Sequence, residues 1–270
     1  MDFKFLPRLS QSFSQLLDDT DDYDVIIKVG EIPNIKEFRA HSVILKSRSP
    51  YFKKALSQDW ITKKDNMINF NKPNVSPRIF EMIIRYMYAG IFDLKEQTCS
   101  DILDLIIAFD ELLLDDELIT FIQNYLIKYQ TRWLQHHCFM VLHKVFRLEN
   151  CQRLQNYCLR TICDNPESFF NSPDFPTLEK GILLELVRRE DLKIGEIKLW
   201  NSLIKWGMAQ TSELRENDAT NLSSWSKKDF IYLKIALNQF ITHIRFFEIS
   251  SNDFHSEIWP FRKVLPEKRC

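Results

Sequence analysis

The spacing of apolar residues predicts a helix near the start of the chain, over residues 8–17. Its apolar side chains recur at helical intervals and share one stripe. They are Leu9, Phe13, Leu16 and Leu17. Because no other element precedes this segment, we expect it to pack on a partner. The acidic residues 18–24 lack the central glycine and closing glutamate of a calcium loop, which favours a solvated linker.

Three short segments after this linker have the composition of β-strands. Residues 24–30 and 35–40 are separated by Pro33-Asn34, which predicts a hairpin. A third strand is predicted over 67–70, where the turn sequence NKPN begins directly afterwards. A small sheet is therefore expected.

Serine residues mark helix starts around these strands, because a serine hydroxyl caps a helix and proline suits its first position. Ser42 is expected to cap a short helix and Ser49-Pro50 to begin another. Ser76-Pro77 is expected to begin a longer helix that stops at Gly90. Two further helices are predicted over 100–113 and 115–129. The apolar stripe of the second comprises Leu118, Phe121, Ile122, Tyr125 and Leu126.

Beyond Tyr129 the pattern is almost entirely helical, with helices predicted over 138–147, 151–164, 178–188, 195–209 and 227–246. This change of pattern indicates a domain boundary at about residue 130. We expect an α+β domain over 8–130, in which a helical cluster flanks the small sheet. An all-α domain over 131–247 and a tail over 248–270 follow.

Composition and charge narrow the class of protein. The chain has 45% hydrophobic residues and a formal net charge of −1, so nucleic acid is not an expected partner. No apolar run is long enough to span a bilayer, and the first residues show no secretory signal. The six cysteines lack the spacing of a disulfide scaffold or of CxxC motifs. A reducing location, cytoplasmic or nuclear, is expected, with no membrane contact.

The candidates for enzymatic chemistry are few. The five glycines form no phosphate-binding motif, so no cofactor is expected. Asp24 with His41, or the cluster His136-His137-Cys138, could supply an acid-base pair. A histidine at a strand-to-helix corner can equally bond the backbone or an aspartate, which is the interpretation we favour. His136 and His143 are roughly 10 Å apart along a helix, too far for one zinc ion.

Three stretches of the first domain resemble the BTB/POZ fold. They are Asp24-Val25, FRAHSVILKSRSPYF at 38–52 and FEMIIRYMYAG at 80–90. The second domain resembles, more loosely, the helical BACK domain that follows BTB in many adaptors. The similarity there lies in DLKI at 191–194 and EIKLWNSLIKW at 196–206. In this resemblance Asp24 and His41 belong to the structural pattern, and no catalytic residue or metal ligand is expected.

The resemblance implies a non-enzymatic homodimer in which the first helix packs against its twin. Leu9, Phe13, Leu16 and Leu17 are then the dimer-interface residues. A self-complementary apolar patch suits a two-fold dimer, because each subunit buries the same surface.

The resemblance also implies a possible partner outside the dimer. Many BTB-BACK proteins are substrate adaptors of cullin-3 ubiquitin ligases, and they carry a hydrophobic residue, any residue and a glutamate after the SPYF helix. Here Trp60, Ile61 and Thr62 are the nearest match, so the hydrophobic position is filled and the acidic one is not. We expect an intracellular adaptor in the ubiquitin-like conjugation pathway, with an unknown client. A scaffold or transcriptional co-regulator without a ligase role is the alternative, and an enzyme ranks third.

Similar adaptors continue into kelch repeats or a TLDc domain. Up to Cys270 this sequence has neither. We therefore expect either that the BACK half binds the client or that the sequence is a shortened member of such a family.

Overall fold

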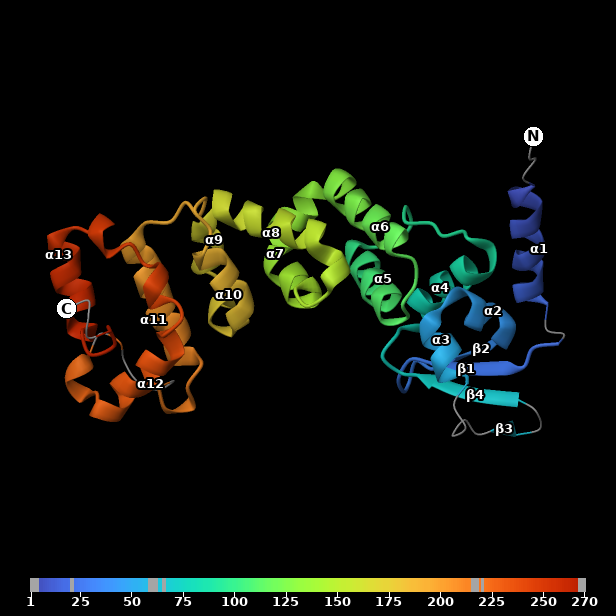
Figure 1. Cartoon of the computed structure of the whole chain (residues 1–270), viewed down its shortest axis with the longest axis horizontal. Coiled ribbons are helices and arrows are strands. Elements are labelled where there is room, and N and C mark those ends of the chain that lie inside the picture. Colours follow the sequence, from blue (N-terminus) through green and yellow to red (C-terminus); the bar gives the residue numbers. More distant parts are fainter. Residues whose placement is uncertain are drawn as a thin grey trace. The chain divides into compact units, whose positions relative to one another are not determined.

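A computed structural model describes residues 5–19, 22–57, 63–64, 67–214, 219 and 221–266, and the chain forms two compact units (Figure 1). Unit 1 comprises Met1–Trp133 and Arg147–Arg153, and unit 2 comprises Leu134–Phe146 and Leu154–Cys270. Within the described residues, none of the helices has the length and apolar character that crossing a membrane would require.

Unit 1 contains a four-stranded sheet with the order β2-β1-β4-β3. The strands are β1 (Val25–Val29), β2 (Lys36–Ala40), β3 (Lys63–Lys64) and β4 (Met67–Lys72). The predicted hairpin is confirmed, because β1 and β2 pair antiparallel with Val25 opposite Ala40. The sequence did not predict that β4 would join β1 in parallel, with Val25 opposite Ile68.

Helices beside this sheet, and others packed on those helices, complete unit 1 (Figure 1). They are α1 (Leu6–Asp18), α2 (Ser42–Arg48), α3 (Pro50–Ala55), α4 (Pro77–Ala89), α5 (Cys99–Glu111) and α6 (Asp116–Tyr129). Aromatic contacts join them to the strands: Phe52 of α3 meets Phe70 with ring centroids 5.7 Å apart. Phe38 of β2 meets Phe80 of α4 at 5.0 Å.

Of the three predicted serine caps, two are confirmed and the one at Ser42 is wrong, although a helix does begin there. The Ser49 and Ser76 hydroxyls accept the backbone N–H groups of Phe52 and Ile79. Gly90 ends α4 in the left-handed conformation, with φ of 70°. Ser42, by contrast, is the first residue of α2 and provides no side-chain cap. The carboxylate of Asp24, which lies 18 positions earlier, accepts the Ser42 N–H instead.

Unit 2 consists of helices and short turns. The helices are α7 (Thr131–Val145, whose first residues belong to unit 1), α8 (Gln152–Asp164), α9 (Pro166–Phe170), α10 (Lys180–Val187), α11 (Glu196–Ala209), α12 (Lys227–Leu237) and α13 (Ser251–Asp253). The helix predicted over 227–246 is therefore too long, since α12 ends at Leu237 and a 3-10 turn covers Ile241–His243.

The core of unit 2 is built around α11. Trp200 and Trp206 are both buried, and each indole N–H finds a backbone carbonyl. Trp206 donates to Leu178 over 2.8 Å and Trp200 to Glu257 over 3.3 Å. The described part of the segment expected as a tail, residues 248–266, packs on this core through buried apolar side chains. These are Ile258, Phe261, Val264 and Leu265.

Candidate functional site

The corner between β2 and α2 holds the two residues that the BTB pattern singled out. Ser42 donates its N–H and its hydroxyl to the two carboxylate oxygens of Asp24, each over 2.6 Å. His41 is 8% exposed, and its backbone N–H donates to the Tyr88 hydroxyl over 2.7 Å. The same hydroxyl lies 2.8 Å from His41 Nδ1. Asp24 thus holds the start of α2, and Tyr88 of α4 holds the histidine.

This geometry favours a structural part for His41. A phenol that accepts one hydrogen bond still has its own proton to donate, so Nδ1 accepts it when the ring carries its proton on Nε2. Burial raises the pKa of the Tyr88 phenol from 10 to about 12, which keeps that proton in place.

Replacing Tyr88 by phenylalanine is expected to lower the free energy of unfolding by about 1–3 kcal/mol, because two buried groups of His41 lose the hydroxyl that they contact. The protein should also lose part of its alkaline pH dependence. The unfolded chain releases the Tyr88 proton above pH 10, whereas the folded chain keeps it to about pH 12. The contribution of Tyr88 to stability is therefore complete below pH 10 and is lost above it, and the variant lacks this contribution. Urea unfolding of both proteins between pH 8 and pH 11 measures this, and parallel curves would contradict it.

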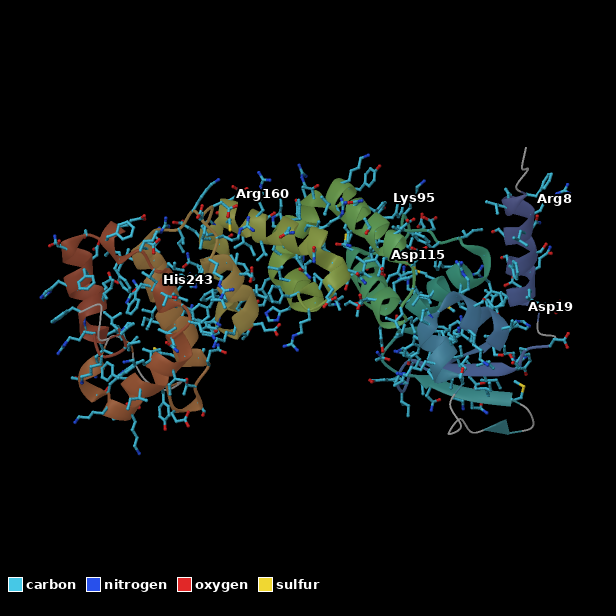
Figure 2. The ribbon with its side chains drawn as sticks, viewed as in Figure 1. Arg8, Asp19, Lys95, Asp115, Arg160 and His243 are labelled. Carbon is cyan, nitrogen blue, oxygen red and sulfur yellow. The ribbon has the colours of Figure 1, made fainter. Side chains whose placement is uncertain are left out.

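The helix α1 presents the predicted dimer residues on a surface that its own chain leaves open. No residue of α1 is buried, and Leu9 is 54% exposed, while Phe13, Leu16 and Leu17 are half-buried. Contrary to expectation, the helix has a neighbour in its own unit. It lies against α4, and the Ser10 hydroxyl donates to the Ala89 carbonyl over 2.6 Å. Figure 2 labels Arg8 near the beginning of α1 and Asp19 just after its end.

A groove of 420 Å³ runs along the contact between α1 and α4. Its apolar lining comes from Met82, Ala89, Ile91 and Phe92, and its charged rim includes Arg78 and Arg85. Ile91 is 59% exposed. Helix α1 contributes Ser14 to this lining, and Glu81 and Asp93 also belong to the rim. An exposed apolar groove of this kind suits a protein partner.

A second apolar surface, which we call the aromatic surface, consists of Tyr86, Phe92 and Phe121. Phe92 lies between the other two, with ring centroids 6.0 Å from Tyr86 and 6.2 Å from Phe121. The guanidinium of Arg48 covers the Tyr86 ring at 5.2 Å. Asp115, which is labelled in Figure 2, caps α6 and accepts a hydrogen bond of 3.4 Å from the Tyr86 hydroxyl.

The sequence pattern placed Phe121 in the core, but its side chain is 56% exposed. The inward face of α6 instead includes Gln123, which is fully buried. Its amide donates to the Asn150 carbonyl over 2.8 Å, and this bond offsets the cost of burying a polar group. The partner lies 27 positions later, so no local pattern could have indicated it.

Trp60, Ile61 and Thr62, the predicted cullin contacts, lie outside the residues that the structure describes. Four of the cysteines are buried: Cys138, Cys151, Cys158 and Cys163. Burial raises the pKa of the Cys151 thiol to about 12, which is the behaviour of an unreactive thiol. Among the described residues, no three His, Cys, Asp or Glu side chains gather as a metal site would require.

Family models assign both halves of the chain. Residues 13–130 match the BTB/POZ domain, and residues 138–224 match the domain described as BTB And C-terminal Kelch, or BACK. The small sheet and its helices thus form a BTB fold, and a helical BACK domain follows it. The chain belongs to the family of BTB-BACK proteins.

Kelch-like proteins are among the curated relatives that match. Human kelch-like protein 41 is 27% identical over 218 residues, which cover 80% of this chain and 33% of that protein. Kelch-like protein 25 of Xenopus laevis is 26% identical over 174 residues, covering 63% of this chain and 28% of that protein. BTB/POZ domain-containing protein 9 of Drosophila melanogaster is 28% identical, covering 68% and 24%. The chain thus spans about a third or less of these relatives. A solved structure, the BTB domain of zebrafish PATZ1, is similar with a TM-score of 0.35 at 21% identity, covering 46% of this chain and 95% of that one.

Proposed function

We propose that this protein is a homodimeric adaptor that joins a client protein to a cullin-3 ubiquitin ligase, in the cytosol or the nucleus, without catalysing a reaction itself. The observation that carries the proposal is a BTB domain followed by a BACK domain, with kelch-like proteins among the relatives. BTB-BACK proteins are adaptors and scaffolds rather than enzymes.

Two surfaces of unit 1 support the proposal, one suited to the dimer contact and the other to the contact with cullin-3. Helix α1 offers exposed leucine and half-buried aromatic area, which a two-fold contact with a second copy would cover. The aromatic surface offers an exposed phenylalanine beside carboxylates at the start of α6, Asp115 to Glu117. An aromatic anchor with an acidic rim suits a helical partner that carries an apolar pocket with basic edges.

A scaffold that does not contact cullin-3 is the second candidate. Thr62 favours it, because this residue stands where the resemblance would place a glutamate. The acidic start of α6 offers a different source of negative charge, and that is why we rank the ligase adaptor first.

Binding of the purified amino-terminal helical domain of cullin-3 tests the proposal directly. The wild type is expected to bind, and Trp60→Ala and Phe121→Ala are each expected to weaken binding about tenfold or more, as the loss of an aromatic anchor does. Phe247→Ala is the matched control, because Phe247 is also exposed, at 85%, but belongs to unit 2. A wild type that does not bind would move the conclusion to the scaffold. If Trp60→Ala and Phe121→Ala bind as tightly as the wild type, neither residue is a cullin contact.

A further inference from the structure

The outward face of α12 in unit 2 carries isoleucine where a surface helix normally carries polar residues. Ile231 and Ile235, one helical turn apart, are 54% and 66% exposed. The opposite face supplies the core with Phe230, Leu233 and Leu237, which are all buried. The two isoleucines therefore contribute nothing to the packing of unit 2 that would explain them, and they form an unpartnered ridge.

Lysines surround this ridge. Lys227 and Lys228 are the first two residues of α12, and at 100° per residue they lie on either side of Ile231 and Ile235. Lys234 borders the ridge further along. Lys263, from the end of unit 2, lies over the buried Phe230 ring on the core side of α12, 4.6 Å from its centroid, and so does not border the ridge.

The positive charge of Lys227 and Lys228 at the start of α12 does not stabilise this helix. The amino-terminal end of a helix carries a partial positive charge, so acidic side chains stabilise it and lysines oppose it. Asp229, the acidic residue of the first turn, bonds the Ser226 N–H over 2.7 Å in the capping box. Among the ion pairs of the described residues none involves Lys227, Lys228 or Lys234, whereas Lys193 and Lys198 in the same unit each bond a carboxylate. The ridge is thus an apolar strip in an uncompensated positive field.

We propose that the α12 ridge binds an amphipathic helix of a partner protein whose apolar stripe is flanked by Asp and Glu. The ridge of side chains four residues apart fits the groove between such rows on a second helix. Carboxylates beside the groove would then meet Lys227, Lys228 and Lys234. Charge complementarity selects the acidic partner, and the two isoleucines supply the apolar contact that holds it.

A helix fits this surface better than a membrane does. Helices that lie in a membrane surface need a broad apolar face, often with aromatic anchors. Here the exposed apolar strip is a single ridge on one helix of 11 residues. If the bound helix belongs to the client, that assignment rests on the proposed function. The binding surface itself does not depend on cullin-3.

Two synthetic helical peptides test the proposal on the full chain without cullin-3. Both carry leucines at intervals of three and four residues, one with glutamates at the flanking positions and the other with lysines. The acidic peptide is expected to bind the wild type, measured by fluorescence anisotropy, and to weaken as salt is added. The basic peptide is not. The double variant Ile231→Glu/Ile235→Glu should lose at least tenfold in affinity, about 1.4 kcal/mol. The charge reversal Lys227→Glu/Lys228→Glu should favour the basic peptide instead.

Val43→Glu is the matched control, because Val43 is 69% exposed on α2 but lies in unit 1 and in neither of its apolar surfaces. Circular dichroism confirms that each variant is folded. Three results would overturn the proposal: acidic-peptide binding that the α12 variants leave unchanged, absence of any peptide binding, or binding of anionic phosphatidylserine vesicles but not of the peptide. A shift of the α12 double variant in sedimentation relative to the wild type would assign the ridge to self-association and would also overturn it. Because cullin-3 is absent throughout, none of these outcomes bears on the ligase test.

Discussion

Exchanging Leu9 or Phe13 for aspartate is expected to convert the protein from a dimer into a monomer at micromolar concentration. Burying a leucine or phenylalanine side chain is worth about 1.5–3 kcal/mol, and a two-fold contact contains each position twice. One substitution should therefore raise the dimer dissociation constant by on the order of 100-fold or more. Sedimentation equilibrium measures this constant.

The design separates loss of the dimer from loss of the fold. Leu9 is 54% exposed, so an aspartate there leaves the packing of α1 on α4 intact. Phe13 and Leu16 are half-buried, and their double aspartate variant also tests the contact with α4. Gln15→Asp is the control, because Gln15 is exposed on the same helix and lies off the apolar stripe. A dimer that survives in both Leu9→Asp and the double variant would show that α1 is not the interface.

Removing the charge of Arg245 should be among the most destabilising changes in unit 2. Its guanidinium pairs with Glu196 at 2.7 Å, and the Glu196 side chain is only 4% exposed. Breaking a fully buried pair typically costs about 3–5 kcal/mol. The Arg245 side chain is 45% exposed, so this pair is expected to cost less. The Arg245 backbone N–H still donates to Glu196 over 3.0 Å, which lowers the expected loss for Arg245→Met to about 2–4 kcal/mol. Urea unfolding followed by tryptophan fluorescence measures it, since Trp200 and Trp206 belong to unit 2.

A double-mutant cycle shows whether the buried charge is the cause. Glu196→Gln/Arg245→Met leaves no unpaired buried charge, since Glu248, the other partner of Arg245, is exposed, and it should recover most of the lost stability. Lys193→Met is the control, because its partner Asp164 and Lys193 itself are both exposed, and surface pairs contribute little. Equal destabilisation by the single and double variants would show that the cost comes from packing of the arginine stem instead.

Local chemistry explains which elements the sequence predicted well. The caps at Ser49 and Ser76 and the left-handed stop at Gly90 depend on hydrogen bonds within four residues. The neighbouring residues in the sequence are therefore enough to predict them. The same holds for the capping box at Ser226 and Asp229. The BTB resemblance of the first half likewise depends on short stretches of sequence, and the family match over residues 13–130 agrees with it.

Long-range contacts explain what the sequence left open. The parallel pairing of β4 with β1 joins segments about 40 residues apart. The hydrophobic pattern of a strand indicates which of its faces is buried, but not which strand pairs with it. The face of α6 was misjudged because the bond from Gln123 to Asn150 permits an amide in the core. Phe121, an apolar residue, consequently became part of an exposed surface.

By itself the sequence determined the helices with their local caps, the hairpin, the change to an all-helical second half and the BTB-BACK resemblance, because each depends on residues close together in the chain. Only the tertiary structure decided which side chains face outward and which charges are paired. Glu196 and Arg245 are 49 positions apart, and α12 exposes Ile231 and Ile235 to solvent. The physical reason is that burial and charge compensation depend on distances that folding alone creates.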